Sequence, residues 1–115
     1  MTTKSTKEQL VITKGHEELT LDYTSLRKVM LVLRAINHPI RQQLIELLEK
    51  NDKMIVTELH SQLRLEQSIV SQHLAVLRKA GILLTKRSGK FIYYSINIQR
   101  MKEVKILVQE ISRLN

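Results

Sequence analysis

Hydrophobic residues recur at helical spacing in five stretches of the chain, and the first of these stretches runs from about Tyr23 to Ile36. Leu26, Val29 and Leu33 fall on one stripe of this predicted helix. Residues 29–33 are also an unbroken apolar run, which is wider than a single stripe. We therefore expect this helix to be covered on two sides.

Two shorter helices follow. Pro39 begins the second, because its fixed φ suits the first turn of a helix, and Asn51-Asp52 ends it. The third spans about Thr57 to Leu63, with Thr57 as the candidate N-cap. Residues 64–66 then form a three-residue turn.

The fourth predicted helix runs from about Gln67 to Ala80, and Gly81 stands where a left-handed C-terminal cap is expected. At about 100° per residue, Val70, Leu74 and Leu77 point to one side. The opposite face is polar, small or basic. It carries Gln67, Ser68, Ser71, Gln72, Ala75, Arg78 and Lys79.

A hairpin and a last helix complete the pattern. Residues 82–87 and 91–96 are strand-like and are joined at Ser88-Gly89, so they predict a two-stranded hairpin with a basic tip. The last helix is expected over about Asn97 to Leu114. Its apolar side carries Ile98, Met101, Val104, Val108, Ile111 and Leu114, with Leu107 beside them.

The first residues of the chain give a weaker signal. Residues 2–7 are polar without a period and predict a disordered tail. Residues 10–12 begin either a short helix or a strand, and the pattern leaves both open. We divide the chain into a flexible N-terminal segment, residues 1–20, and a folded domain, residues 21–115.

Composition favours packed helices. The chain has 115 residues, of which 43% are hydrophobic and 3% aromatic, with no Trp and no Cys. One aliphatic core is expected, and disulfides and thiolate metal sites are excluded. Nothing resembles a signal peptide or a membrane span, so we expect a cytoplasmic protein without a membrane partner. The predicted fold is mainly α with a small β-hairpin: a winged helix-turn-helix of about five helices and a two-stranded wing.

Nearly all the excess charge lies in one third of the chain. The net charge is +8, and residues 67–102 hold seven basic residues and no acidic one, a balance of +7. This concentration is typical of a surface that meets phosphates. A solvated basic face is the simpler interpretation, and charge alone does not decide between the two.

The arrangement of side chains favours double-stranded DNA as the partner. A helix that follows a short helix and a tight turn, and that exposes small and amide side chains, has the form that enters a major groove. Gln67, Ser68, Ser71 and Gln72 are the candidate base contacts. The candidate backbone or wing contacts are Arg64, His73, Arg78, Lys79, Lys86, Arg87 and Lys90. For His73, a packing role is an equal alternative.

Four segments together resemble the ArsR/SmtB family of winged-helix repressors. They are residues 37–41 (NHPIR), 44–48 (LIELL), 71–81 (SQHLAVLRKAG) and 89–96 (GKFIYYSI). The resemblance implies a homodimer joined through the first and last helices, which represses transcription until an inducer releases it. A dimer would also cover the apolar surplus on those two helices. The implied interface comprises Leu26, Val29, Met30, Leu33, Met101, Val104, Val108 and Ile111.

The chain departs from the family where metals are sensed. Members with a site at the third helix place a Cys-x-Cys pair there, whereas this chain has Ile55-Val56-Thr57. Members that bind zinc on the last helix use Asp, His and Glu, and this helix offers only Glu103 and Glu110. We expect no metal site, no cofactor and no metal sensing at the usual positions, and no residue identifies an inducer.

Two other classes of function fit less well. An enzyme is disfavoured because the chain has no glycine-rich phosphate loop, no nucleophile motif and no obvious carboxylate set. A winged helix that binds only other proteins is the main alternative. Such a surface should expose apolar anchors, whereas the predicted face is polar and basic.

Overall fold

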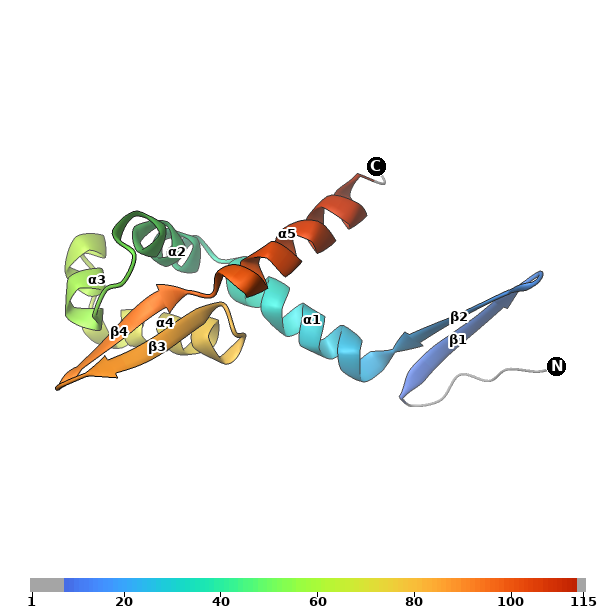
Figure 1. Ribbon diagram of the computed structural model, residues 1–115, viewed down its shortest axis with the longest axis horizontal. Coiled ribbons are helices and arrows are strands. Elements are labelled where there is room, and N and C mark those ends of the chain that lie inside the picture. The colour runs from blue at the N-terminus through green and yellow to red at the C-terminus, as the bar shows by residue number, and fades with distance from the viewer. Residues whose placement is uncertain (1–7, 114–115) are drawn as a thin grey trace. The chain divides into compact units, whose positions relative to one another are not determined.

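The computed structural model describes residues 8–113, which fall into two compact units that meet at Leu31 and Val32 (Figure 1). Each unit is described by itself, and α1 runs through the boundary. The elements are β1 (Gln9–Lys14), β2 (Glu17–Asp22), α1 (Tyr23–Ile36), α2 (Pro39–Asn51), α3 (Val56–Leu63), α4 (Gln67–Lys79), β3 (Leu83–Ser88), β4 (Phe91–Ile96) and α5 (Ile98–Ser112). The predicted fold class, with five helices and a two-stranded wing, is confirmed.

The first unit begins with a β-hairpin. β1 and β2 pair antiparallel, and Gly15 adopts a φ of 61° in the turn. Residues 10–12, for which the sequence left helix and strand open, lie in β1. The predicted tail over residues 2–7 lies outside the described residues, and the domain division after residue 20 stays a prediction.

The hairpin continues into α1 without a linker. The amide of Tyr23 donates to the carbonyl of Glu8 (2.8 Å). Asp22 accepts from the Thr24 amide (3.1 Å) and the Ser25 hydroxyl (2.8 Å), so it caps the first turn of α1. The hydrogen bond from Ser25 is the main cause that lowers the pKa of Asp22.

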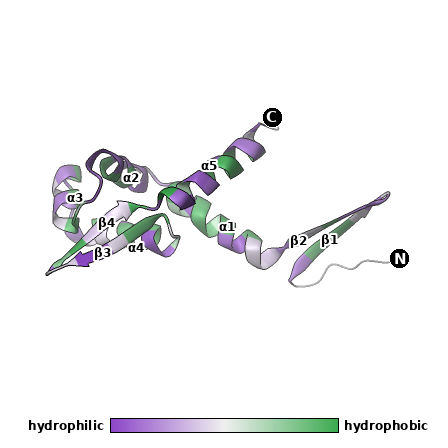
Figure 2. Ribbon diagram, viewed as in Figure 1, coloured by the Kyte–Doolittle hydropathy of each residue, from purple (hydrophilic) through white to green (hydrophobic). Residues whose placement is uncertain are grey.

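α1 has the predicted bounds but is not covered on two sides within this chain. In Figure 2 its apolar residues form a green stretch. Leu26, Val29, Met30 and Leu31 are each at least 37% exposed. Ala35, in the last turn, is the buried residue of the helix.

In the second unit α2 follows the end of α1, and its predicted start and end are confirmed. His38 has an extended backbone, and its Nδ1 accepts from the amide of Ile40 (3.1 Å), while Pro39 occupies the first turn. The helix ends at Asn51, and Asp52 follows with a φ of 63°.

The predicted N-cap of α3 was wrong. The capping residue is Ile55, whose amide donates to the side chain of Glu58 (3.0 Å), and Thr57 lies inside the helix. The reason is a contact far away in sequence. Met54 exchanges two backbone hydrogen bonds with Tyr94 (3.0 and 2.8 Å), which holds the chain extended up to the residue where α3 begins.

One aliphatic core holds the second unit together, as the scarcity of aromatic residues predicts. Its largest fully buried side chains come from α2, α3, α4 and the segment before β3. They are Leu44, Leu48, Leu59, Val70, Leu74, Leu77 and Ile82. A core of this kind fixes the roll of α4 about its axis, and therefore fixes which face of α4 meets solvent.

Gly81 ends α4 as predicted. It adopts a φ of 77°, and the amide of Ile82 donates back to the carbonyl of Leu77 (2.9 Å). A Cβ at this position would lie 3.2 Å from Nε of Arg100.

Gly81→Ala is therefore expected to lower the free energy of unfolding by about 1–2 kcal/mol for the left-handed backbone, plus the cost of displacing the Arg100 side chain. Gly89 is the matched control, because its φ is 62° and a Cβ there meets nothing within 4 Å. Urea unfolding of the Gly81→Ala and Gly89→Ala proteins measures the loss of unfolding free energy in each. Equal losses would show that Arg100 gives way freely.

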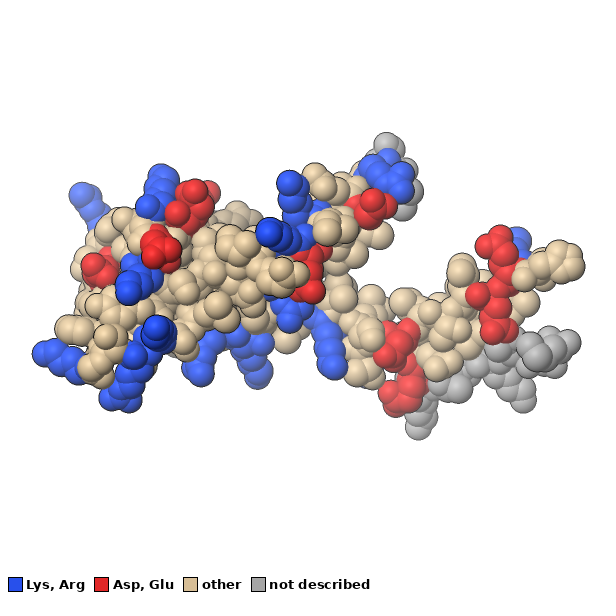
Figure 3. Space-filling model, in the orientation of Figure 1, with Lys and Arg blue, Asp and Glu red and all other residues tan. Residues whose placement is uncertain are grey.

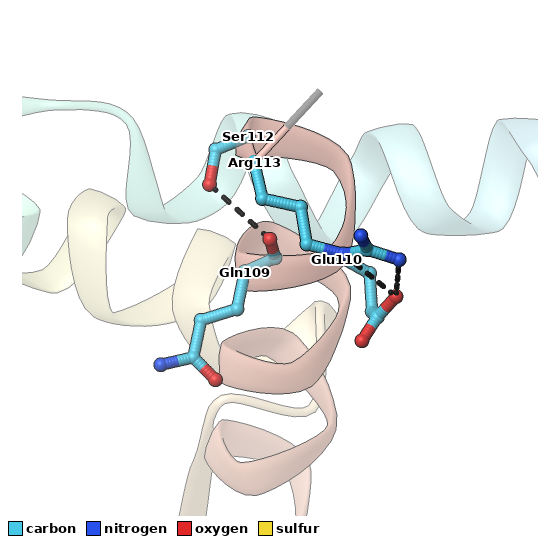
Figure 4. Close-up of polar contacts among 4 residues, drawn as sticks. All are labelled: Gln109, Glu110, Ser112 and Arg113. Atoms are coloured by element: carbon cyan, nitrogen blue, oxygen red, sulfur yellow. Dashed lines mark hydrogen bonds and ion pairs between the residues drawn. The ribbon is translucent and has the colours of Figure 1, made fainter. Parts of the chain in front are cut away.

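α5 begins where Asn97 caps it. The Asn97 side chain accepts from the amide of Arg100 (3.3 Å) and donates to the carbonyl of Gly81 (2.9 Å), so it ties α5 to the end of α4. Near the other end, Arg113 donates twice to Glu110 (3.0 and 3.3 Å) (Figure 4). The predicted last residue of the helix, Leu114, lies outside the described residues.

The predicted apolar side of α5 divides into two parts. Met101 and Val104 are half-buried against the core of their own chain, whereas Val108 and Ile111 are exposed. No helix in the described part of the chain is both long and apolar enough to cross a lipid bilayer.

Candidate nucleic-acid interface

A tight turn joins α3 to α4. Arg64 has a left-handed φ of 57°, its amide donates to the carbonyl of Ser61, and the amide of Leu65 donates to that of His60 (3.1 Å). Leu65 is half-buried against the core. Three residues therefore turn the chain from α3 into α4, as predicted, and leave the side chain of Arg64 exposed.

α4 presents the two faces that its periodicity predicts. Val70, Leu74 and Leu77 are at most 1% exposed. The residues predicted to point outward are all exposed: Gln67, Ser68, Ser71, Gln72, Ala75, Arg78 and Lys79. The free face thus begins with small and amide side chains and ends with two cations.

His73 lies at the edge of that face and is half-buried. Its ring centroid is 4.6 Å from that of His38, and its Nδ1 is 3.3 Å from Nη1 of Arg41. Because a guanidinium can only donate, Nδ1 of His73 accepts and the ring is neutral in this contact. Burial, then the nearby His38 and Arg41, lower the pKa of His73. The contact with Arg41 therefore occupies Nδ1 of His73. A phosphate contact by Nε2 stays a prediction.

Arg41 is a residue whose role the sequence did not reveal. Its Nε donates to the carbonyl of Ala35 (2.6 Å) and its Nη2 to that of Arg34 (3.2 Å). Together with the contact to His73, these bonds join the last turn of α1 and the first turn of α2 to the middle of α4. The partners lie 6, 7 and 32 residues away, so no local pattern signals them.

The wing turns one residue later than predicted. Ser88 pairs with Phe91 as the last residue of β3, so the turn is Gly89-Lys90 rather than Ser88-Gly89. β3 also begins at Leu83, because the amide of Ile82 is used in the cap of α4. Lys86, Arg87 and Lys90 are exposed near the tip, as expected.

The wing also has a basic and aromatic face that the sequence did not predict. Nζ of Lys90 lies 5.4 Å from the ring of Phe91, and Nζ of Lys53 lies 4.9 Å from the ring of Tyr93. Lys53 comes from the loop after α2, which the bridge at Met54 holds beside β4. Figure 3 shows Lys and Arg side chains projecting from this end of the unit. Lys53 is thus a further candidate for a phosphate contact.

Lys90→Ala is expected to weaken binding to specific and random DNA by the same factor, because a phosphate contact carries no sequence information. The slope of log K against log salt should fall in magnitude by about 0.9 for each substituted protomer on the DNA. Fluorescence anisotropy at several salt concentrations measures both. Lys14→Ala, which removes a charge from β1, should change neither, and a Lys90 effect confined to one DNA sequence would contradict the assignment.

The described residues hold no group of three or more side chains that could bind a metal ion. The two carboxylates of α5 face arginines instead: Glu103 lies 3.6 Å from Arg100, and Glu110 lies 3.0 Å from Arg113. Residues 55–57, where a Cys-x-Cys pair would stand, form the N-cap and first turn of α3.

Known proteins resemble this chain over most of its length. Residues 38–84 match the family described as "Bacterial regulatory protein, arsR family". An uncharacterized HTH-type transcriptional regulator of Methanocaldococcus jannaschii is 34% identical over 80 residues, which are 70% of this chain and 90% of that protein. The transcriptional activator HlyU of Vibrio cholerae is 34% identical over 87 residues, 76% of this chain and 77% of HlyU.

Solved structures of similar proteins share the fold. The crystal structure of the transcriptional repressor PagR of Bacillus anthracis superimposes with a TM-score of 0.62 at 36% identity, and the match covers 76% of this chain and 99% of that one.

Proposed function

This chain belongs to the ArsR family of bacterial regulatory proteins and is a DNA-binding transcription regulator, not an enzyme, and we propose that it represses transcription as a homodimer on a near-palindromic operator. The observation that carries the proposal is the exposed face of α4. This face is polar and basic, and the core beneath fixes its direction. We expect the protein to be cytoplasmic. The exposed face of α4 would lie in the major groove of the operator.

Base contacts are assigned to the first two turns of α4, where the exposed side chains are small hydroxyls and uncharged amides. Gln72 has the amide geometry that pairs with N6 and N7 of an adenine, and Gln67 can do the same from the first turn. Ser68 and Ser71 can donate to or accept from several bases, and their small size allows α4 to approach closely.

Phosphate contacts are assigned to the cations around that face. Arg78 and Lys79 end α4, Arg64 lies in the turn before it, and Arg87 and Lys90 lie at the tip of the wing with Lys86 behind them. These contacts would position the protein on the duplex without specifying its sequence.

The dimer interface is supported by apolar surface that this chain leaves open. Leu33, Val104 and Val108 line one groove within the second unit. Leu26, Val29 and Met30 are exposed on the earlier turns of α1, and Ile111 is 62% exposed on the last turns of α5. A second copy would cover these surfaces by two-fold symmetry. Met101 and Val104, half-buried already, would add less than Val108 and Ile111.

Repression is the simpler of two possible outcomes of DNA binding. Among the similar proteins, PagR is named a repressor and HlyU an activator. A dimer that occupies an operator can block transcription by its presence alone, whereas activation needs a further productive contact.

We also propose that metals do not control this regulator through the family's usual sites. The carboxylates of α5 pair with arginines, and residues 55–57 offer no soft ligand. A thermal-shift screen tests this. Zinc at micromolar concentration should leave the melting temperature unchanged, and a clear stabilisation would contradict the proposal.

The test of DNA binding itself is its salt dependence. Each phosphate contact should add about 0.9 to the magnitude of the slope of log K against log salt. Six contacts from each of two protomers would give a slope of about −11. Binding that does not change with salt would favour a winged helix that binds proteins instead.

A further inference from the structure

The β1–β2 hairpin has one apolar face that its own strands cannot cover. The register places Leu10 opposite Leu21 and Ile12 opposite Leu19, and side chains on paired positions share a face. Ile12, Leu19 and Leu21 are 47, 61 and 44% exposed. A two-stranded hairpin alone is marginally stable in water. Its fold therefore needs a surface against this face.

The charge of the hairpin indicates what that surface is. Residues 8–22 hold four acidic residues and one basic one, a net charge of −3. Three of the acidic residues lie in β2 and the fourth, Glu8, directly precedes β1, and Figure 3 shows acidic side chains along this segment. DNA phosphates would repel this segment, whereas a basic surface with apolar side chains would attract it.

α5 carries a surface of that kind on the side away from the core. Ile98 and Ile106 are 58 and 62% exposed, and Lys102 lies between them at spacings of four residues, so the three form one ridge. The helix and its cap, residues 98–113, hold four basic and two acidic residues, a net charge of +2. The ridge lies outside the groove assigned to the dimer interface, and the expected apolar stripe did not include Ile106.

We propose that the hairpin of one protomer docks its apolar face on the Ile98–Lys102–Ile106 ridge of a second copy. The inference rests on the homodimer of the proposed function. β2 passes into α1 without a linker, and Asp22 and Glu8 bond to the first residues of α1, so the hairpin is an extension of a helix already assigned to the interface. A partner that covers the exposed turns of α1 would therefore also come within reach of the hairpin.

Crosslinking between differently tagged chains tests the contact, because the protein has no native cysteine. Leu19→Cys in one chain and Ile106→Cys in the other should give a covalent product of mixed mass with a short bismaleimide. Thr20→Cys, on the opposite face of β2, is the matched control and should give much less product.

Sedimentation equilibrium of the same samples separates the two ways of failing. A dimer that gives no mixed product would overturn the docking and leave the dimer intact. So would a product between two Leu19→Cys chains. A chain that carries both Leu19→Cys and Ile106→Cys tests the remaining alternative, because a link within that one chain would also overturn the docking. A monomer would overturn the homodimer and the docking together.

A second pair of variants measures the docking without crosslinks. Leu19→Glu should raise the dissociation constant of the dimer about tenfold or more, because each of two symmetric sites loses a buried leucine. Thr20→Glu adds the same charge to the opposite face and should leave the constant unchanged. Equal effects, with unchanged circular dichroism, would overturn the proposal.

Discussion

Gln72→Ala is expected to reduce the preference for the operator over random DNA by about five- to 150-fold for each half-site that is read, the range for losing one bidentate base contact. Gln72 is exposed in the second turn of α4, one position before His73, and the buried Val70 and Leu74 on either side hold its direction. The phosphate contacts remain, so binding to random DNA should change little. Competition binding at fixed salt, with operator and random duplexes, measures the ratio.

Gln99→Ala is the control for this substitution. It removes the same side chain from an exposed position on α5 and should leave the ratio unchanged. If Gln72→Ala weakened both DNAs equally, Gln72 would contact the backbone and the assignment of base contacts to α4 would be wrong.

Val108→Glu is expected to raise the dissociation constant of the dimer by at least about a hundredfold. Val108 lines the groove assigned to the interface and is 48% exposed in the single chain. Symmetry places the change on both copies, so losing two buried valines costs about 3 kcal/mol before the desolvation of the carboxylates is counted. Operator affinity should fall with the dimer, since a monomer reads one half-site. Analytical ultracentrifugation and operator titration measure the two effects.

Gln99 again provides the control, because it lies nine residues before Val108 and so about 180° around α5. Gln99→Glu introduces the same charge on the same helix, outside the groove but beside the Ile98–Lys102–Ile106 ridge, and should weaken the dimer far less than Val108→Glu. A Val108→Glu protein that still dimerises would place the interface elsewhere.

The sequence predicted those features that local spacing determines. The bounds of α1 and α2, the two faces of α4 and the cap at Gly81 all follow from helical periodicity and from residues that begin or end helices. The exposed face of α4 could be predicted for the same reason, because three buried residues at helical spacing fix the direction of all the others.

The features that were missed depend on contacts between distant segments. The prediction that Thr57 caps α3 was wrong, because the pairing of Met54 with Tyr94 fixes the start of this helix. That pairing also holds Lys53 beside the wing, and no periodicity signals it. Residues 10–12 form a strand because they pair with β2, and this pairing is not contained in their own sequence.

From selection of bound duplexes in a random library, we expect an enriched inverted repeat whose half-sites are centred about one helical turn, ~34 Å, apart. The same selection with Gln72→Ala should lose enrichment at matched positions in both half-sites. Recovery of a pool without any shared motif, or of a motif that Gln72→Ala leaves unchanged, would contradict the reading of a specific DNA sequence by a symmetric dimer through α4.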